Sequence, residues 1–532
     1  MNLRKASLLF LATIMLFSVV LAGCGGNDKN EGAQEENTAT EATPQELHLM
    51  ISDEPLLDPQ KISYAFEFTV VANVMEGLVR LGENEKVVPG MAETWETSED
   101  GLTWTFNLRD AKWSDGSAVT ADDFVYGWNR ATSPDVAAIY SYIVNDHVSK
   151  VEAVDEKTLQ VTLKNPTPYF ESLMAFATFF PAKKDFVEAQ GAEYGTDADK
   201  LLYNGPFVLK EWNHNNKLIL AKNENYWDAE TVQLDTITLD IIKDGNAALS
   251  LYEEGSLDQT GLAREQVVMY QDSPEFNVES QANLFWIIFN TKNPALQNAN
   301  IRKALSYGYD RQAYIDVILN NGAKVATGLV PEGIPGPGGK SFREVNGDLV
   351  TYDEAKAKEY LEQGLKELGM DKLPTITYIG YDNDSGIKGA EFLKENYKKI
   401  GVDVKIENLP VAAVKERKQN GDFDIFFTGW GPDYWDAMTF LDVFVTDGPN
   451  NDGKWSNAEF DQLIAAARVE ADPEKRLQYM VDAEKILIQD DAAIAPVFFK
   501  SVSYLKKPYV KNVIRHQFGY DEDWKWASIE GK

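Results

Sequence analysis

Alternation of apolar and polar residues marks several short strands along the chain. A period of two places every second side chain on the same face of a sheet. Longer apolar runs without alternation indicate strands that are covered on both faces. Together the two patterns predict strands at residues 46–51, 104–108, 159–163, 218–220, 237–242 and 284–289.

Segments with helical spacing of apolar residues lie between these strands. Within residues 65–77 the apolar positions fall on one helix face, and Gly77 is the expected C-cap. Another helix is predicted to begin after Thr120, because its hydroxyl suits an N-cap and two aspartates follow it in the first turn. A further helix is predicted at residues 246–254.

Helices and strands alternate more regularly from about residue 300 to residue 490. Helices are predicted at 301–307, 311–319, 353–368, 387–400 and 475–488, and strands at 375–379, 402–406 and 423–427. This alternation is typical of a layered βαβ arrangement, so the expected fold class is α/β. Two apolar strands at 494–499 and 501–505 close the chain, and we expect them to join the domain that begins at residue 46.

Composition supports a large globular protein and excludes polyanionic partners. The chain has 532 residues, enough for roughly three domains, and 44% of them are hydrophobic. Its 84 Asp and Glu residues outnumber 51 Lys and Arg residues, which gives a formal net charge of -33. A protein this acidic is repelled by nucleic acid and by anionic membrane surfaces, so neither is an expected partner through charge.

The N-terminus has the pattern of a bacterial lipoprotein signal peptide. Residues 1–23 contain Arg4, Lys5 and an apolar segment that is short for a membrane span. Cys24, the only cysteine, follows Leu-Ala-Gly, which resembles the lipobox whose cysteine becomes the lipidated N-terminus. The alternative is an ordinary cleavage site before Cys24. Residues 24–45 are polar and are expected to be a flexible linker.

A carboxylate stands in an unusual place near residue 430. The apolar run 423–427 predicts a strand, and the Gly429-Trp430-Gly431-Pro432 sequence that follows predicts a turn. Asp433 comes directly after this turn and lies between tryptophans in the sequence. Because burial of an unpaired charge is costly, Asp433 is either a solvated turn residue or the partner of a cationic guest.

Several separated motifs occur in order along residues 46–532. They are Lys112-Trp113-Ser114-Asp115-Gly116 with Thr120-Ala121-Asp122-Asp123-Phe124-Val125-Tyr126 and Trp128; Asn204-Gly205-Pro206-Phe207; Asn225-Tyr226-Trp227; Asn300-Ile301-Arg302-Lys303-Ala304-Leu305 with Asp310-Arg311; and Gly429-Trp430 with Asp433-Tyr434. Each motif alone is weak, but their order and spacing are specific. Together they resemble the extracellular oligopeptide-binding proteins of ABC importers, family 5 of the solute-binding proteins.

The resemblance implies a two-lobed fold of the type II periplasmic-binding-protein kind, with an additional α/β domain inserted in the first lobe. Lobe I is then expected at 46–75, 205–300 and 496–532, the inserted domain at 76–204, and lobe II at 301–495. The pattern of apolar and polar residues itself changes near residues 204, 300 and 495, in agreement with these limits.

The family likeness also implies a function and a binding site. Members capture oligopeptides between the lobes and deliver them to the permease subunits of an ABC importer; this implies a monomer held by lipid on the outer face of a bacterial cell membrane. Asp433 matches the family position that pairs with the α-ammonium group of the peptide. The other matching positions are the backbone of Gly429, Gly431 and the segment from Ser63 to Ala65, and Tyr140 or Tyr142. The aromatic residues Trp430, Tyr434 and Trp435 are further candidates for the lining of side-chain pockets.

Two alternatives stay open for these residues. The three aromatic residues of the turn either line side-chain pockets or belong to the core. Recognition of the peptide carboxylate is also open, because well-known relatives carry an arginine where this chain has Phe427. Lys388 or Lys418 could replace that arginine, although each also fits a solvated helix position.

Other classes of function are disfavoured by missing motifs. The four histidines are scattered without metal-ligand spacing, and no nucleophile-elbow motif occurs, so no catalytic residue, metal or cofactor is expected. Gly339-Lys340-Ser341 imitates the end of a P-loop but lacks the required earlier glycine. Within the family, a dipeptide, a metal chelate, an oligosaccharide or a peptide signal is an alternative ligand.

Overall fold

A computed structural model of the chain describes residues 44–532. Cys24, the predicted signal peptide and nearly all of the predicted linker lie outside the described residues. Among the residues that are described, none of the helices has both the length and the apolar character needed to span a membrane.

A four-stranded sheet combines the start of the described chain with residues from beyond position 200. Its order is β1 (Glu46–Ile51), β10 (Thr236–Ile241), β9 (Lys217–Lys222) and β8 (Phe207–Asn213). Strand β1 runs parallel to β10, whereas the other neighbours are antiparallel. The predicted strands at 46–51, 218–220 and 237–242 are confirmed by this sheet.

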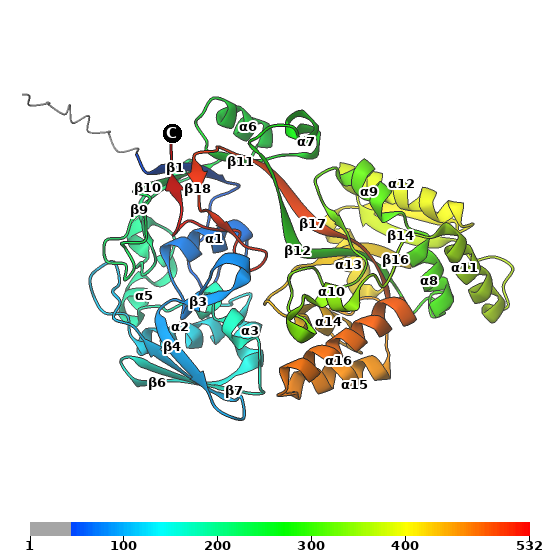
Figure 1. The fold of residues 1–532 in the computed structure, drawn as a ribbon, viewed down its shortest axis with the longest axis horizontal. Coiled ribbons are helices and arrows are strands. Elements are labelled where there is room, and N and C mark those ends of the chain that lie inside the picture. Colours follow the sequence, from blue (N-terminus) through cyan, green and yellow to red (C-terminus); the bar gives the residue numbers. More distant parts are fainter. Residues whose placement is uncertain (1–43) are drawn as a thin grey trace, which may run out of the picture. The chain divides into compact units, whose positions relative to one another are not determined.

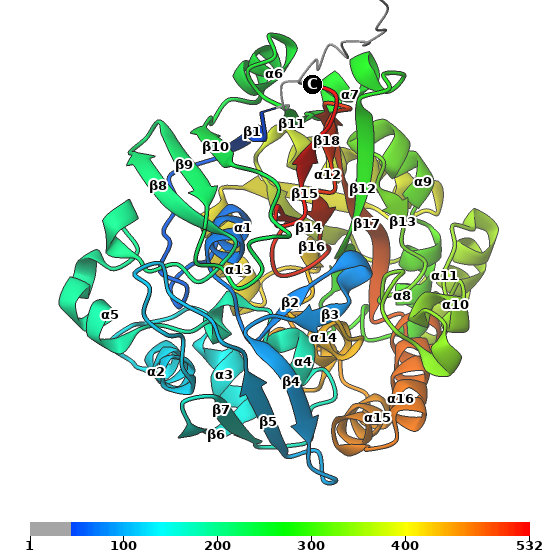
Figure 2. The same cartoon turned by 60° about the vertical axis from the view of Figure 1, so that its left-hand side comes forward.

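A second four-stranded sheet is antiparallel and lies wholly between residues 92 and 163. Its order is β4 (Ala92–Thr97), β5 (Thr103–Leu108), β7 (Thr158–Leu163) and β6 (Val148–Asp155). Helix α2 (Ala121–Thr132) packs against β6 and β7 (Figure 2).

The predicted start of α2 is confirmed, and its cap explains one of the sequence motifs. The carboxylate of Asp123 accepts hydrogen bonds from the Thr120 backbone N–H at 2.9 Å and from the indole N–H of Trp113 at 3.1 Å. Trp113 is almost completely buried. The Trp-Ser-Asp-Gly turn is thereby fixed to the N-terminus of the helix.

The largest sheet joins the C-terminal part of the chain to the middle. Its order is β11 (Gln259–Gly261), β17 (Ile494–Lys506), β12 (Phe276–Phe289), β16 (Ile425–Trp430), β14 (Ile376–Tyr381) and β15 (Val404–Leu409), and β13 (Lys324–Val325) also pairs with β17. The long strands β12 and β17 are antiparallel neighbours and can be followed in Figure 1. Their register shifts between Ser280 and Leu284, where the ladder is irregular.

Helices of the C-terminal half pack on this sheet or on one another: α12 contacts β14 and β15, α8 contacts β17, α11 packs on α8, and α15 packs on α16. They are α8 (Ala299–Tyr307), α9 (Arg311–Tyr314), α11 (Glu354–Leu368), α12 (Asp384–Lys399), α13 (Val411–Asn420), α15 (Ala458–Val469) and α16 (Pro473–Lys485). The predicted helices at 311–319 and 475–488 each change into a π-helical turn, at Ile315–Leu319 and Ile486–Asp490.

The remaining elements are short. The helices are α1 (Ala65–Val74), α3 (Ser141–His147), α4 (Phe170–Leu173), α5 (Lys184–Gln190), α6 (Gly245–Glu253), α7 (Arg264–Tyr270), α10 (Phe342–Asn346) and α14 (Met438–Leu441). The strands are β2 (Val79–Leu81), β3 (Val87–Pro89), β18 (Val510–Lys511), β19 (Ile514–Arg515), β20 (Glu522–Asp523) and β21 (Ser528–Ile529).

Two sequence-based expectations are wrong in detail. The closing strands at 494–499 and 501–505 form one continuous strand, β17, which pairs with β12, β11 and β13. Helix α1 ends before Met75, so Gly77 is not its C-cap. A Cβ at Gly77 would lie 2.8 Å from the Met174 carbonyl oxygen, which shows that this glycine permits a close approach of two segments.

The Asn-Ile-Arg-Lys-Ala-Leu motif has a structural explanation. Its Arg302 is buried and donates hydrogen bonds to the backbone carbonyl groups of Leu296, Gln297 and Asp491. Arg311, also buried, donates to the carbonyl oxygen of Pro496 at 2.6 Å. Both arginines therefore tie the helices that begin near residue 300 to the segment that leads into β17.

Candidate functional site

The edge of strand β16 is free where the predicted binding motif begins. Strand β16 pairs with β12 along its whole length, from Ile425 to Trp430. It pairs with β14 only at Ile425 and Phe426. In the part of the chain that the structure describes, no strand is paired with the other edge of β16 from Phe427 onward. Backbone N–H and C=O groups at such an edge can receive an added strand.

Packing against β12 explains the two glycines of the motif. A Cβ at Gly429 would lie 2.8 Å from the ring of Phe285 and 2.9 Å from the carbonyl oxygen of Leu284. A Cβ at Gly431 would lie 2.4 Å from the amide nitrogen of Asn283. Close approach to the β12 backbone therefore requires glycine at position 429, whereas at position 431 only the end of the Asn283 side chain would have to move. Their pairing with a ligand stays a prediction.

Asp433 lies just past β16 with no ion-pair partner among the described residues. Its backbone N–H donates to the Thr439 hydroxyl at 3.1 Å, which fixes the turn. Its carboxylate accepts one long hydrogen bond, from the Tyr142 hydroxyl at 3.4 Å. Burial raises the pKa of Asp433 to about 6, and the Tyr142 hydrogen bond offsets only part of this rise. A nearby cation would remove the penalty on the ionised form.

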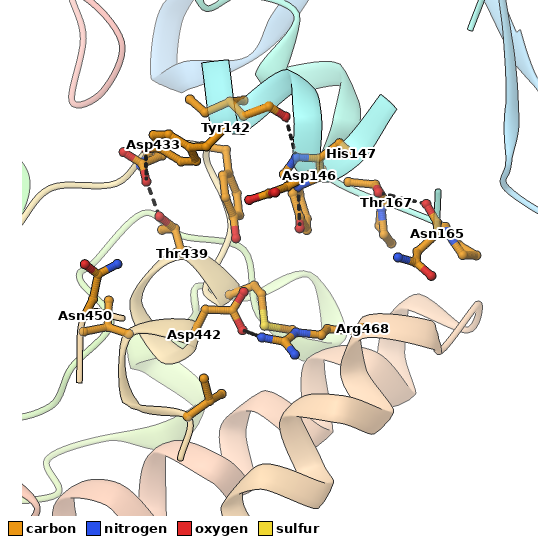
Figure 3. Close-up of a pocket in the computed structure, with 18 of the residues that line it drawn as sticks. Tyr142, Asp146, His147, Asn165, Thr167, Asp433, Thr439, Asp442, Asn450 and Arg468 are labelled. Atoms are coloured by element: carbon orange, nitrogen blue, oxygen red, sulfur yellow. Dashed lines mark hydrogen bonds and ion pairs between the residues drawn. The ribbon is translucent and has the colours of Figure 1, made fainter. Parts of the chain in front are cut away.

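A cavity of about 480 Å³ contains the Asp433 carboxylate (Figure 3). One wall comes from residues 142–169, and the other comes from residues 430–476. The two arginines on its lining are occupied: Arg468 donates to Asp442 at 2.7 Å, and Arg476 donates to both oxygens of Asp436. Asp146 also lines the cavity. The unpaired charges on the cavity lining are therefore negative and suit a cationic group.

Tyr142 and Tyr140 connect this cavity to helix α1. The Tyr142 ring lies 6.2 Å from that of Tyr140, and Tyr140 lies 5.6 Å from the ring of Phe68 in α1. Burial and the Asp433 carboxylate together raise the pKa of both tyrosines, so both hydroxyls stay protonated at neutral pH. Of the two candidate tyrosines, Tyr142 contacts Asp433 directly, whereas Tyr140 supports it by packing.

Tyr434 and Trp435 hold the turn against neighbouring segments. The Tyr434 ring stacks on that of Tyr169 with a centroid distance of 4.0 Å, and it is buried. The Trp435 ring stacks on Phe518, and its backbone N–H donates to the Ser172 hydroxyl at 3.3 Å. Tyr434 also lines the Asp433 cavity. Both aromatic residues thus position the turn, and a further role of either in binding stays a prediction.

Trp430 borders two cavities. It lines the cavity around Asp433 and also a second one of about 480 Å³ beside the free edge of β16. Its indole N–H is buried and has no hydrogen-bond partner among the described residues.

The backbone groups of Ser63 and Ala65 are partly occupied within their own segment. The Ser63 N–H donates to the Glu67 carboxylate at 2.8 Å, and that carboxylate also accepts from the N–H groups of Tyr64 and Leu56. The Ala65 carbonyl oxygen accepts from the Thr69 hydroxyl. Neither Ser63 nor Ala65 lines the Asp433 cavity or the second cavity. Their predicted role in ligand binding depends on a rearrangement that brings them closer.

The two lysines considered for a peptide carboxylate are already paired. Lys388 lies 2.6 Å from Asp384, and Lys418 lies 2.8 Å from Asp452. Neither lines the cavity around Asp433 or the second cavity.

Sequence reasoning missed the groups that complete the two cavities. Thr439 and Asp146 lie at the Asp433 carboxylate's cavity, and Tyr314, Tyr378 and Tyr381 lie at the second one. Apart from Tyr378 and Tyr381, which share β14, they come from separate elements, so no local spacing marks them as one site. Among residues 44–532, no group of three or more His, Cys, Asp or Glu side chains is arranged to hold a metal ion.

A chain of this architecture, with an acidic cavity beside a free strand edge, belongs to the class of solute-binding proteins. The family model described as bacterial extracellular solute-binding proteins, family 5 Middle, matches residues 86–452. The chain belongs to this family. The expected periplasmic-binding-protein fold of type II is confirmed by the solved structures it resembles.

Similar proteins cover nearly all of the chain. The dipeptide-binding protein DppE of Bacillus subtilis is 34% identical over 96% of this chain and 96% of its own length. The oligopeptide-binding protein OppA of the same organism is 35% identical over 95% of this chain and 96% of its own. The structure of Listeria monocytogenes OppA bound to peptide is similar with a TM-score of 0.72, 36% identity, and coverage of 91% of this chain and 99% of that chain.

Proposed function

We propose that the protein captures oligopeptides outside the cell and delivers them to an ABC importer. One observation carries this proposal: among the described residues, the partly buried Asp433 carboxylate has no ion-pair partner in an acidic cavity, and the adjacent edge of β16 has no paired strand. A free peptide offers the complement of both features, because it has an ammonium terminus and an extended backbone.

Energetics support a ligand held mainly through its backbone. Each backbone hydrogen bond contributes about 0.5 to 1.5 kcal/mol net, and a bond to a charged group contributes about 1.5 to 3 kcal/mol. Roughly six backbone bonds and one ammonium–carboxylate bond reach about 8 kcal/mol, which corresponds to micromolar affinity. Such a complex needs little recognition of side chains.

The names of similar proteins leave the length of the peptide open. DppE is named for dipeptides and OppA for oligopeptides. The unpaired edge of β16 extends over Phe427 to Trp430, and two cavities border it, so the longer ligand is favoured here. A surface receptor for a peptide signal would use the same site and is the second candidate.

The attachment of the protein to the cell and the roles of its domains are part of the same proposal. Lipid on Cys24 would hold the protein at the outer face of the membrane, and residues 24–45 would be the linker to the folded part. Lobe I (46–75, 205–300, 496–532), the inserted domain (76–204) and lobe II (301–495) would close around the peptide as a monomer and present it to the permease subunits.

Mass spectrometry of the natural ligand tests the function directly. The protein is purified from its host without denaturation, and small molecules are then released and identified. The proposal expects a mixture of short peptides with free N-termini. A single sugar, a metal chelate or another non-peptide molecule in stoichiometric amount would refute it, and one unique peptide would favour the signal receptor.

A further inference from the structure

Two arginines line the cavity that contains Asp433, and they come from a pair of packed helices. Arg468 lies in α15 and Arg476 lies in α16. Arg476 is almost completely buried, with 3% of its side chain exposed, whereas Arg468 is half exposed. A cation on a cavity wall repels a cationic ligand, and water and salt screen this repulsion less when the cation is buried. Without a neutralising partner, either arginine would oppose the binding of an ammonium group at Asp433.

Each arginine is neutralised by an aspartate from the segment that follows Asp433. Arg476 donates to both carboxylate oxygens of Asp436, at 2.8 and 2.9 Å, which is the strong bidentate geometry of an arginine–carboxylate pair. Arg468 donates to Asp442 at 2.7 Å (Figure 3). Two of the three aspartates in this segment are therefore bound to arginines, whereas Asp433 has no ion-pair partner among residues 44–532.

The opposite charges of the buried pair balance each other at the cavity. Burial raises the pKa of Asp433, the Tyr142 hydrogen bond lowers it in part, and neither arginine lowers it further. Burial is also the main influence that raises the pKa of Asp442. There the charge of Asp436 acts to raise the pKa, and the charge of Arg476 acts to lower it. Loss of the Asp436 charge alone would leave the positive charge of Arg476 unbalanced in the cavity.

Asp436 also has a local structural role, which can be separated from its charge. Its carboxylate accepts the backbone N–H of Met438 at 2.9 Å, at the start of α14. An asparagine side chain retains one carbonyl oxygen that can accept this hydrogen bond, but it carries no charge. Asparagine at this position therefore removes the neutralisation of Arg476 and keeps an acceptor for the turn.

We propose that Asp436 and Asp442 determine the specificity of the site by neutralising Arg476 and Arg468, so that the cavity accepts the ammonium terminus of a peptide at Asp433. The inference rests on the proposed function and extends it to residues beyond the one that pairs with the ligand. Asp436 does not line the cavity, so it acts through its arginine. The preference for a free N-terminus then depends on the charge balance of the whole segment.

The preference for the ammonium group can be measured as a ratio of two affinities in the full mature protein. One tetrapeptide is titrated calorimetrically in its free form and in its N-acetylated form. In Asp436→Asn the affinity for the free peptide is expected to fall about 10- to 100-fold, because the buried Arg476 charge repels the ammonium group. The affinity for the acetylated peptide, which has no charge at its N-terminus, is expected to change by less than about threefold.

A second exchange distinguishes the charge of Asp436 from its role in the turn. The double variant Asp436→Asn with Arg476→Met removes both members of the pair. It is expected to restore the ratio of the two affinities to within about threefold of wild type, since no unbalanced charge is left. Damage to the turn would instead persist in the double variant and would weaken both forms of the peptide alike.

The partly exposed pair repeats the test where folding is less at risk. Arg468 is screened by water, so Asp442→Asn is expected to weaken free-peptide binding only about 3- to 10-fold, and Arg468→Gln added to it should restore the affinity. Asp228→Asn is the matched control. It leaves the buried Lys525, 2.8 Å from Asp228, without this partner, and neither residue lines the cavity. The control is expected to keep the wild-type ratio.

The outcomes separate this inference from the proposed function. If Asp436→Asn and Asp442→Asn both keep the wild-type ratio, or if the double variants do not restore it, the inference is refuted and peptide capture stands. Loss of the ratio in Asp228→Asn would refute it as well. If Asp436→Asn does not fold, the variants of the Asp442 pair decide by the same criteria. If wild-type protein binds the free and acetylated peptides equally, the ammonium site itself fails and the inference fails with it.

Discussion

At the scale of single residues, the important feature of the site is that burial makes the ionised form of Asp433 unfavourable. Its pKa of about 6 means that the folded protein binds a proton more readily than the unfolded chain, in which aspartate has its ordinary pKa of 3.8. The unoccupied site therefore loses stability as the pH rises through this interval. In the proposed complex the ammonium group of the ligand would offset this cost, so binding would depend on the charge of this one carboxylate.

Replacement of Asp433 by asparagine should stabilise the ligand-free protein at pH 7 to 8. The gain is expected to be about 1 to 3 kcal/mol, because the variant has no buried charge, and partial exposure of the side chain reduces the effect. The gain should be present above pH 6 and should vanish below pH 4, where the wild-type carboxyl group is protonated. Urea unfolding at several pH values measures it; a variant less stable than wild type at pH 8 would contradict the account.

Peptide affinity should fall in mild acid for the same reason. If only ionised Asp433 binds the ammonium group, lowering the pH from 7.5 to 5.0 should weaken binding by about tenfold, since a group with a pKa near 6 is mostly protonated at pH 5. Calorimetric titration of one free peptide at both pH values measures the change. The Asp433→Asn variant is the control and should show a much smaller pH dependence.

At the scale of elements, the structure depends on a few buried polar groups that fix loops to helices. Glu67 in the first turn of α1 is buried and accepts backbone hydrogen bonds from Leu56, Ser63 and Tyr64. Its carboxylate thereby organises the segment that the family likeness assigns to peptide contact. The fold at this point rests on one side chain that satisfies three donors.

Glu67→Ala should therefore destabilise the protein by about 2 to 5 kcal/mol, because three backbone donors lose their acceptor. Denaturant unfolding measures the loss. Glu362 is exposed on α11, and Glu362→Ala is the matched control, expected to stay within about 0.5 kcal/mol of wild type. Equal stability of the Glu67 variant and wild type would show that the segment is held in another way.

The positions of helices and strands were predictable from the sequence, whereas the pairing of strands and the tertiary packing were predictable only in part. The predicted strand at 46–51 and the helix that begins after Thr120 agree with β1 and α2, because apolar spacing and capping residues act locally. The single strand β17 was missed, since its pairing with β12 joins residues more than 200 positions apart. The helical pattern predicts that Gly77 is a C-cap, but close tertiary packing explains why glycine occurs at this position.

The candidate site was predictable to a similar extent. The strand and turn before Asp433 marked the carboxylate, and the family likeness gave it a role. Its partner Tyr142 and the aromatic cavity at Phe427 depend on tertiary contacts between distant segments. Patterns along the chain contain no information on such contacts unless a family likeness supplies it.

At the scale of the whole molecule, the proposed lipid anchor makes attachment to the cell depend on Cys24. Cys24→Ala should release the protein into the medium or leave the signal peptide attached, because the acyl chains that hold it would have no attachment site. Cell fractionation and metabolic labelling with radioactive palmitate measure the two effects. Cys24→Ala protein that is processed normally and stays with the membrane would contradict lipid anchoring.

The central claim is that Asp433 binds the ammonium group of a peptide. Calorimetric titration of wild-type protein at pH 7.5, with one tetrapeptide in its free form and in its N-acetylated form, tests this claim most directly. We expect the acetylated peptide to bind at least about 30-fold more weakly, and the difference to disappear in Asp433→Asn, since a buried charge pair of this kind contributes about 2 to 5 kcal/mol. Equal affinity of the two forms for the wild-type protein would contradict the account.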